Sequence, residues 1–173
     1  MNSHRWAAAL ALGLAGSCAA LLPSAAPVLS PQPASERLRL RFDVRGVQVY
    51  VCQRADGAAP SWQFVEPEAA LFDEDGQPLG SHGAGPAWQA DDGARIVGSV
   101  VAKVDGPGGD VIAWLLLRSG PGGGSDRLAG LTAVQRIHTE GGAAPAEGCG
   151  DAELGRIARV PYTARYTFFE SAP

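Results

Sequence analysis

Apolar and polar residues alternate with a period of two along several stretches of the chain, a pattern typical of half-buried β-strands. The clearest stretch is Val160–Phe168, and a second is Leu38–Val44. At Arg45-Gly46 the apolar positions change phase, so we expect a bulge or tight turn there. A separate strand is expected to follow over Val47–Gln53, with Cys52 on the face opposite the valines.

Other strands are expected from composition and from turn signals. Ile96–Val104 is rich in β-branched residues, and Val111–Leu117 is nearly all apolar, which predicts a strand buried on both faces. Pro67 limits the segment that precedes it, and Asp75-Gly76 is a hairpin signal. The remaining expected strands and short apolar pieces are Trp62–Val65, Ala70–Phe72, Gln77–His82 and Leu131–Thr139.

These elements predict an all-β fold. The chain has 173 residues with 23 glycines and 13 prolines, which favours many short elements joined by turns. No segment keeps a helical period over about ten residues. We expect residues 38–173 to form one domain, a sandwich or barrel of about eight to ten short, mostly antiparallel strands.

The first 26 residues are predicted to be a signal segment. Basic residues at the start precede an apolar stretch, Trp6–Ala15, which is too short to cross a bilayer. Leu14–Cys18 resembles a bacterial lipobox, in which Cys18 is lipidated, although Ala15 replaces the usual branched residue. The alternative is ordinary cleavage near Ser24–Ala26, where Pro27 would hinder the peptidase. Either way an exported location is expected: periplasmic, cell-envelope or extracellular.

Residues 27–37 are rich in Pro and Ser and are interpreted as a flexible tether. Beyond Cys18 two cysteines remain, Cys52 and Cys149. In an oxidising compartment they are expected to form one disulfide. One reactive cysteine is the competing interpretation, but it would leave the other thiol unexplained.

Net charge narrows the range of partners. The formal net charge is −4, and the arginines do not form a basic patch: Arg37, Arg39 and Arg41 alternate as the solvated face of a strand. A nucleic-acid partner is therefore not expected. Membrane contact is expected only through a lipid anchor at Cys18.

The stretch with the most chemically capable side chains is Ser81–Gly98, and its first part, Ser81–Asp92, is interpreted as the functional loop. His82 lies next to glycine, so its imidazole is a candidate acid or base that titrates near neutral pH. The alternative, which we favour, is that His82 binds a loop carbonyl and fixes a turn. Trp88 is the tryptophan expected to be partly exposed, as a flat surface for a ligand ring.

Two further candidates in this loop are Asp91 and Asp92. Together they could bind a cation or a ligand, or one could act as a general base. Asp92 precedes Gly93, however, and turn formation is the favoured interpretation. Trp62, Trp114, Tyr50 and Tyr162 are other aromatic residues that could stack on a ligand, although Trp114 is expected in the core.

Complete catalytic or metal-binding motifs are absent from the sequence. His82, His138 and a carboxylate have the residue types of a zinc site, but there is no HxH or HExxH pair, so no metal is predicted. There is no GxSxG elbow and no strand leading into a GxGxxG turn, so no cofactor is expected.

Several blocks together resemble one family, the exported domain-of-unknown-function 3455 family of bacteria and fungi. They are GVQVYVCQ, WQFVEPEAALFDEDG, GSHGAGPAW, WLLL, VQRIHTEGGAAP, GC (Gly148-Cys149) and VPYTARYTFF, and the resemblance covers about residues 38–170. This chain has Gly83 where the family often has an aromatic residue, and His138 where the family often has Asn. The resemblance implies no reaction, and the Asn argues against a catalytic role for His138.

The sequence therefore favours binding over catalysis. The leading hypothesis is an envelope or secreted module that binds a small molecule or glycan through Ser81–Asp92. Alternatives are a hydrolase or isomerase with His82 as acid or base, and a purely structural envelope protein.

Overall fold

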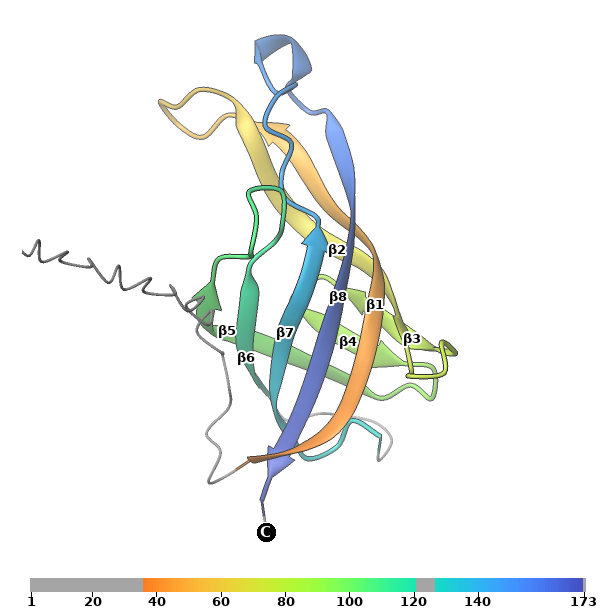
Figure 1. Cartoon of the computed structure of the whole chain (residues 1–173). Helices are drawn as coiled ribbons and strands as arrows, with labels where there is room; N and C mark the ends of the chain where they lie inside the picture. The colour runs from red at the N-terminus through yellow and green to blue at the C-terminus, as the bar shows by residue number, and fades with distance from the viewer. Residues whose placement is uncertain (1–35, 121–126, 173) are drawn as a thin grey trace, which may run out of the picture.

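The computed structural model describes residues 36–120 and 127–172, which form a closed antiparallel barrel of eight strands (Figure 1). The all-β fold is confirmed, and a barrel rather than a sandwich is observed. The strands are β1 (Glu36–Gln53), β2 (Ser61–Phe72), β3 (Pro78–Gly83), β4 (Ala87–Ala90), β5 (Arg95–Val104), β6 (Trp114–Ser119), β7 (Leu131–Gly141) and β8 (Ile157–Ser171). A 3-10 turn spans Asp151–Glu153.

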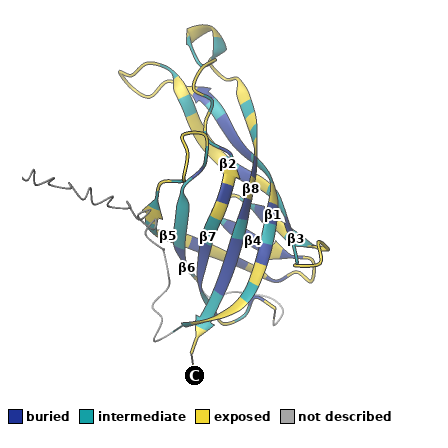
Figure 2. Ribbon diagram, in the orientation of Figure 1, coloured by how far each residue is buried: buried dark blue, intermediate teal, exposed yellow. Residues whose placement is uncertain are grey.

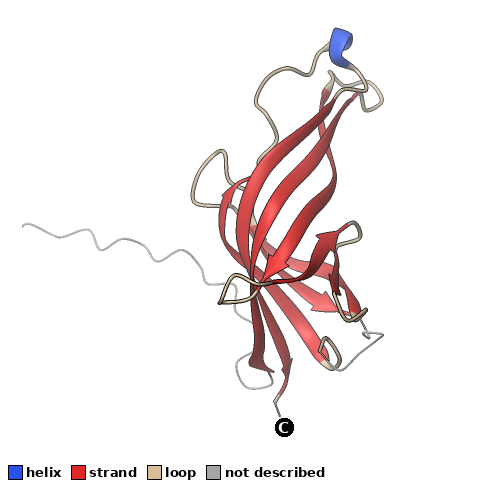
Figure 3. Ribbon diagram, turned by 90° about the vertical axis from the view of Figure 1, so that its right-hand side faces the viewer, coloured by secondary structure: helices blue, strands red, loops and turns tan. Residues whose placement is uncertain are grey.

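Each strand pairs with the next one in the chain, and β8 returns to pair with β1. This up-and-down order places alternate loops at opposite ends of the barrel. The loops after β1, β3, β5 and β7 face one end, called here the upper end, and the β1–β2 and β7–β8 loops reach the top of Figure 1. The loops after β2, β4 and β6 share the lower end with the start of β1 and the end of β8. Figure 3 shows the longest strands rising above the others.

β1 is one continuous strand, so the expected break at Arg45-Gly46 is wrong. Its pairing with both β2 and β8 runs through Gly46 without a shift. A Cβ atom at Gly46 would lie 2.2 Å from the Glu68 carbonyl oxygen, so glycine is needed for the close approach of β2. After Gly46, the inner face of β1 continues with Gln48 and Tyr50, which are both buried. The expected phase change assumed that Val47, Val49 and Val51 point inward instead.

β2 also runs further than expected, because it passes through Pro67. The β2–β3 ladder ends at Ala69 and His82, so β2 has no partner on that side at Pro67, and the missing N–H is tolerated. The expectation for Val111–Leu117 is wrong as well. β6 begins only at Trp114, and of its residues only Leu117 is buried, whereas the others are half-buried.

The core fills the lower part of the barrel (Figure 2). In β8 the alternation predicted from sequence is confirmed, because Tyr162, Ala164, Tyr166 and Phe168 are all buried. They pack with inward residues of the other strands, including Phe42, Val44, Leu71, Trp88, Ile96, Leu117 and Val134. Burial of this apolar surface is the main force that holds the sheet closed.

The disulfide between Cys52 and Cys149 is confirmed. Cys52 lies near the end of β1, and Cys149 lies in the long loop between β7 and β8, with their Cα atoms 5.4 Å apart. The Cys52 amide also donates to the Arg156 carbonyl at 2.8 Å. These links fasten the upper loops to the tip of β1.

Residues 1–26, with Cys18, lie outside the described residues, as does most of the expected tether. β1 begins at Glu36 rather than at Leu38, so the last tether residues belong to the barrel. Among the described residues, no helix is long and apolar enough to cross a membrane.

Candidate functional site

The barrel wall has an opening on one side, because the β3–β4 hairpin is much shorter than the strands on either side of it. β2 has no ladder partner on the β3 side over residues 61–68, and β5 has none on the β4 side beyond Gly98, within the described part of the chain. The gap between β2 and β5 above this hairpin is called here the side opening. Phe64 and Val100 lie on its two edges and remain exposed.

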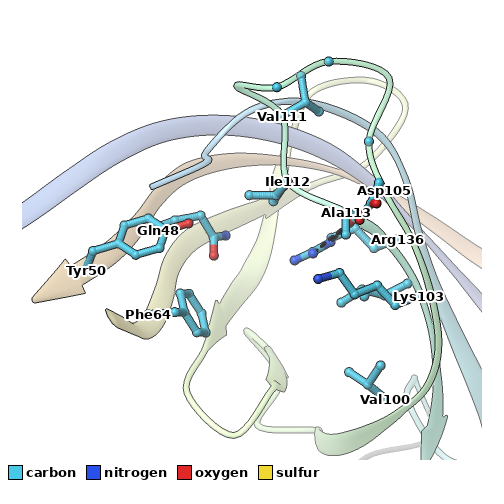
Figure 4. Close-up of a pocket in the computed structure, with 14 residues that line it drawn as sticks. Gln48, Tyr50, Phe64, Val100, Lys103, Asp105, Val111, Ile112, Ala113 and Arg136 are labelled. Atoms are coloured by element: carbon cyan, nitrogen blue, oxygen red, sulfur yellow. Dashed lines mark hydrogen bonds between the residues drawn. The ribbon is translucent and has the colours of Figure 1, made fainter. Parts of the chain in front are cut away.

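An outer cavity of about 710 Å³ lies at the side opening. Strand residues and the β5–β6 loop line it, as Figure 4 shows: Gln48, Tyr50, Phe64, Val100, Lys103, Asp105, Val111, Ile112, Ala113, Leu115 and Arg136. In that view the Lys103 and Arg136 side chains point into the cavity from one wall, toward Gln48 and Phe64 on the other. The volume is within the range of small-molecule sites in proteins.

An inner chamber of about 190 Å³ continues from the outer cavity into the barrel. The two spaces share Gln48, Phe64, Val100, Leu115 and Arg136. Val65, Pro67, Pro86 and Leu117 add apolar walls, and His82, Trp88 and Tyr166 form its aromatic inner end. A ligand could therefore reach from solvent to the core of the barrel.

His82 lies at this inner end, and both of its ring nitrogens form hydrogen bonds with protein groups. Its Nδ1 is 2.9 Å from the Ala87 carbonyl oxygen, and its Nε2 is 2.9 Å from the Tyr166 hydroxyl. A carbonyl only accepts, so Nδ1 carries the proton and donates, and Tyr166 donates its hydroxyl proton to Nε2. Because His82 is 3% exposed, the expectation of an exposed imidazole is wrong. The histidine instead binds the carbonyl of Ala87, the first residue of β4, and so holds the short turn between β3 and β4.

Burial determines the charge state of these groups. Burial, with a smaller contribution from the positive charge of Arg136, lowers the pKa of His82 to about 4, although the hydrogen bond to Ala87 opposes the shift. Burial raises the pKa of Tyr166 and of Tyr162. At neutral pH the inner end of the pocket is therefore uncharged.

Trp88 is fully buried, so the expectation of partial exposure is wrong. The stretch expected to be one loop is instead the β3–β4 hairpin, in which His82 and Trp88 are directly paired. The indole also packs edge-on against Tyr166 and Phe168, with ring centroids 5.4 and 5.7 Å away. Trp88 thus lines the inner chamber and is at the same time part of the hydrophobic core.

Asp91 and Asp92 lie at the lower end of the barrel, away from the pocket. They occupy the turn between β4 and β5, and Asp92 accepts a hydrogen bond from the Ala94 amide at 3.0 Å. Asp92 also pairs with Arg127 at 3.4 Å. The turn interpretation agrees with this geometry, and the structure does not bring these residues together with His82 and Trp88 at one site.

Residue types suited to a metal are dispersed. His138 is exposed on β7, whereas His82 is inside the barrel with both ring nitrogens occupied. Within the described ranges, no group of three His, Cys, Asp or Glu side chains is arranged to hold an ion.

A family described as "Protein of unknown function (DUF3455)" matches residues 33–170. The chain belongs to the DUF3455 family. No curated protein and no solved structure is significantly similar to it. Because the family description names no function, the function of this DUF3455 chain is inferred from its pocket.

Three polar pocket residues of this DUF3455 protein, Gln48, Lys103 and Arg136, were not identified from sequence. Gln48 interrupts the apolar run Val47–Val51, a signal that indicates an inward polar group once the strand's inner face is known. Arg136 follows Gln135 in a strand of mixed polarity and carries no such signal. The phase assigned to β1 placed Gln48 outside. Tyr50 was named as a candidate stacking residue, and it does line the outer cavity.

Proposed function

We propose that this protein is an exported small-molecule-binding module whose ligand occupies the inner chamber and the outer cavity. The observation that supports it best is the continuity of the two spaces, which run from the side opening to the aromatic rings of Trp88 and Tyr166. Binding sites of proteins are concave and mostly apolar, with a few convergent polar groups, and this pocket has that character.

The walls favour an apolar ligand over a glycan. The inner chamber is lined mainly by side chains without hydrogen-bonding groups, among them Val65, Pro67, Leu115 and Leu117. A sugar there would lose its hydrogen bonds to water without replacement, which is costly. A flat hydrocarbon or aromatic ring would instead bury apolar surface against Phe64 and Trp88.

Acid–base catalysis by His82 is less well supported than binding. A general base works best with a pKa near the operating pH and with a nitrogen directed at the substrate. The pKa of His82 is about 4, and both of its nitrogens already bind protein groups. We therefore assign His82 to shaping the inner end of the pocket.

Export is part of the proposal. It is supported by the apolar leader sequence and by the Cys52–Cys149 disulfide, which is compatible with an oxidising compartment. Labelling of the full chain with a radioactive fatty acid in its host, compared with a Cys18→Ser variant, decides whether Cys18 is lipidated. Recovery of the unprocessed protein in the cytoplasm would contradict export.

A matched pair of valine variants tests the binding site. Val100 lines both cavities, whereas its neighbour Val101 lines neither, and the two are about equally exposed at 51% and 55%. We expect the neutral dye N-phenyl-1-naphthylamine to fluoresce when it binds the barrel. Val100→Trp should fill the opening and weaken binding at least about tenfold, a loss that one blocked ring contact can produce.

Val101→Trp should leave dye binding within about twofold of the unsubstituted protein. Circular dichroism and urea unfolding show that both variants keep the fold. If the two variants weaken dye binding equally, or if no dye binds at all, the proposed pocket is not the site.

A further inference from the structure

Arg136 is a cation held at the junction of the outer cavity and the inner chamber, and no carboxylate is paired with it. Its Nε and Nη2 both donate to the Ala113 carbonyl oxygen, at 3.0 and 2.8 Å, which fixes the guanidinium in the wall. These bonds use two of its five N–H groups, and the guanidinium also lies near the Tyr166 hydroxyl. Among the described residues, no Asp or Glu lies within ion-pair distance of Arg136.

The positive charge of Arg136 changes the pKa values of the titratable side chains around it. It lowers the pKa of the phenols Tyr50, Tyr162 and Tyr166, opposing the effect of their burial, and it lowers the pKa of His82. All four side chains are neutral at neutral pH, so none of them compensates the guanidinium. The inside of the pocket is positive although the whole chain has a net charge of −4.

Two more hydrogen-bond donors face the same space. Gln48 is 2% exposed and lines both cavities. Among the described residues its Nε2 has no partner at hydrogen-bond geometry, although it lies near the Tyr162 hydroxyl. Lys103 points into the outer cavity from β5 (Figure 4). The one carboxylate among the residues that line the outer cavity is that of Asp105, which is exposed and pairs with neither cation. The pocket therefore has an excess of donors and one net positive charge.

An anionic ligand would accept hydrogen bonds from these donors and balance their positive charge. A buried amide N–H without a partner and a half-buried unpaired guanidinium both lose solvation on folding, and a ligand with acceptor oxygens restores it. A carboxylate suits the planar fork of arginine, which can donate to both oxygens at once. The walls of the adjoining inner chamber are mostly apolar, so the rest of the ligand is expected to be hydrocarbon.

We propose that the ligand is an arylcarboxylate, with its carboxylate between Arg136, Lys103 and Gln48 and its ring in the inner chamber. The proposal rests on the proposed function and adds the chemical class. The chamber of about 190 Å³ suits a single ring, since an apolar cavity of about 150 Å³ in another protein binds benzene. A short linker would join this ring to a carboxylate in the outer cavity.

Calorimetry with a matched acid and amide tests the class of ligand. We expect 3-phenylpropionate to bind the mature protein at least about tenfold more tightly than 3-phenylpropionamide, because only the acid forms charge-assisted hydrogen bonds. Arg136→Gln should remove this preference. Lys103→Gln, at an exposed side chain that makes no ion pair in the described structure, should reduce it about two- to fivefold. Arg95→Gln, at an exposed arginine outside the pocket, is the control and should change nothing.

The outcomes separate the two proposals. Equal binding of acid and amide, or binding of the dye but of neither phenyl compound, overturns the arylcarboxylate inference and leaves the proposed function intact. Binding of neither the dye nor the phenyl compounds overturns both. If Arg136→Gln does not fold, the acid-to-amide ratio of the unsubstituted protein and the effect of Lys103→Gln still decide the inference.

Discussion

The imidazole of His82 lies flat against the indole of Trp88, with ring centroids 4.9 Å apart and ring planes 12° apart. The two residues are direct partners on β3 and β4, so the stack is built into the shortest hairpin of the barrel. Tyr166 closes the arrangement from β8 through its hydrogen bond to His82. The inner end of the pocket is therefore rigid and belongs as much to the core as to the site.

Trp88→Ala is expected to lower the free energy of unfolding by about 3–5 kcal/mol, because a fully buried large aromatic side chain is removed. Urea unfolding followed by circular dichroism measures the change. Trp62→Ala is the control: Trp62 is half-buried at the upper end and donates to the Glu147 carbonyl at 3.0 Å, so about 1 kcal/mol is expected. Similar losses in the two variants would contradict the central position of Trp88.

His82 is expected to make the protein less stable in mild acid. Its pKa is about 4 in the folded protein, against an ordinary value of 6.5 in the unfolded chain, so between these values the unfolded chain binds the proton more strongly. The contribution of neutral His82 to the free energy of unfolding is fully present above pH 6.5. It is lost as the pH falls toward 4, by about 3 kcal/mol in total.

His82→Gln isolates this effect, because an amide can donate and accept but does not titrate in this range. Unfolding free energies of both proteins should be measured from about pH 7.5 to pH 4, which spans the ordinary and the folded pKa of histidine. The unsubstituted protein is expected to lose more stability than the variant over this interval. Parallel pH curves would show that His82 is not held neutral by the fold.

Removal of the disulfide with a Cys52→Ser/Cys149→Ser double variant is expected to cost about 2–5 kcal/mol. The bond closes a segment with a sequence separation of 97, so its loss frees a long loop in the unfolded chain. Thermal unfolding with and without reductant provides the comparison. The double variant should show no response to reductant, and a response would indicate that another thiol is involved.

Gly46→Ala is expected to destabilise the barrel by about 1–3 kcal/mol, since its Cβ would lie 2.5 Å from the Cα atom of Ala69 on β2. Gly109→Ala is the matched control, because a Cβ at Gly109 meets no atom within 4 Å. The difference in melting temperature between the two variants measures the cost of the close approach. Equal melting temperatures would contradict it.

The strand pattern could be predicted where one face is apolar and the other polar. β8 satisfies this condition, and so does the lower part of β1. The upper part of β1 does not, because its inner face carries Gln48 and Tyr50, which line a pocket, and its outer face carries valines. A rule that places apolar residues inside assigns such a strand to the wrong face.

The candidate site could be predicted only in part, for a related reason. His82 and Trp88 were identified from their chemistry, and they do line the inner chamber, but as buried partners in a hairpin. Arg136 and Lys103 come from β7 and β5 and meet only because the barrel curves. The local sequence does not indicate that these two side chains line one cavity. The turn at Asp92-Gly93 could be predicted because it depends on local backbone preferences. The disulfide could be predicted because only two cysteines remain beyond Cys18 in a chain expected in an oxidising compartment.

The shortness of the β3–β4 hairpin has a kinetic consequence. The edges of β2 and β5 at the side opening already lack partners, so a ligand can pass between them without breaking a ladder hydrogen bond. Association should then proceed at a rate set by diffusion and orientation rather than by a conformational change of the barrel. Amide hydrogen exchange in the closed β1–β8 ladder should accordingly be the same whether the pocket is being filled or emptied.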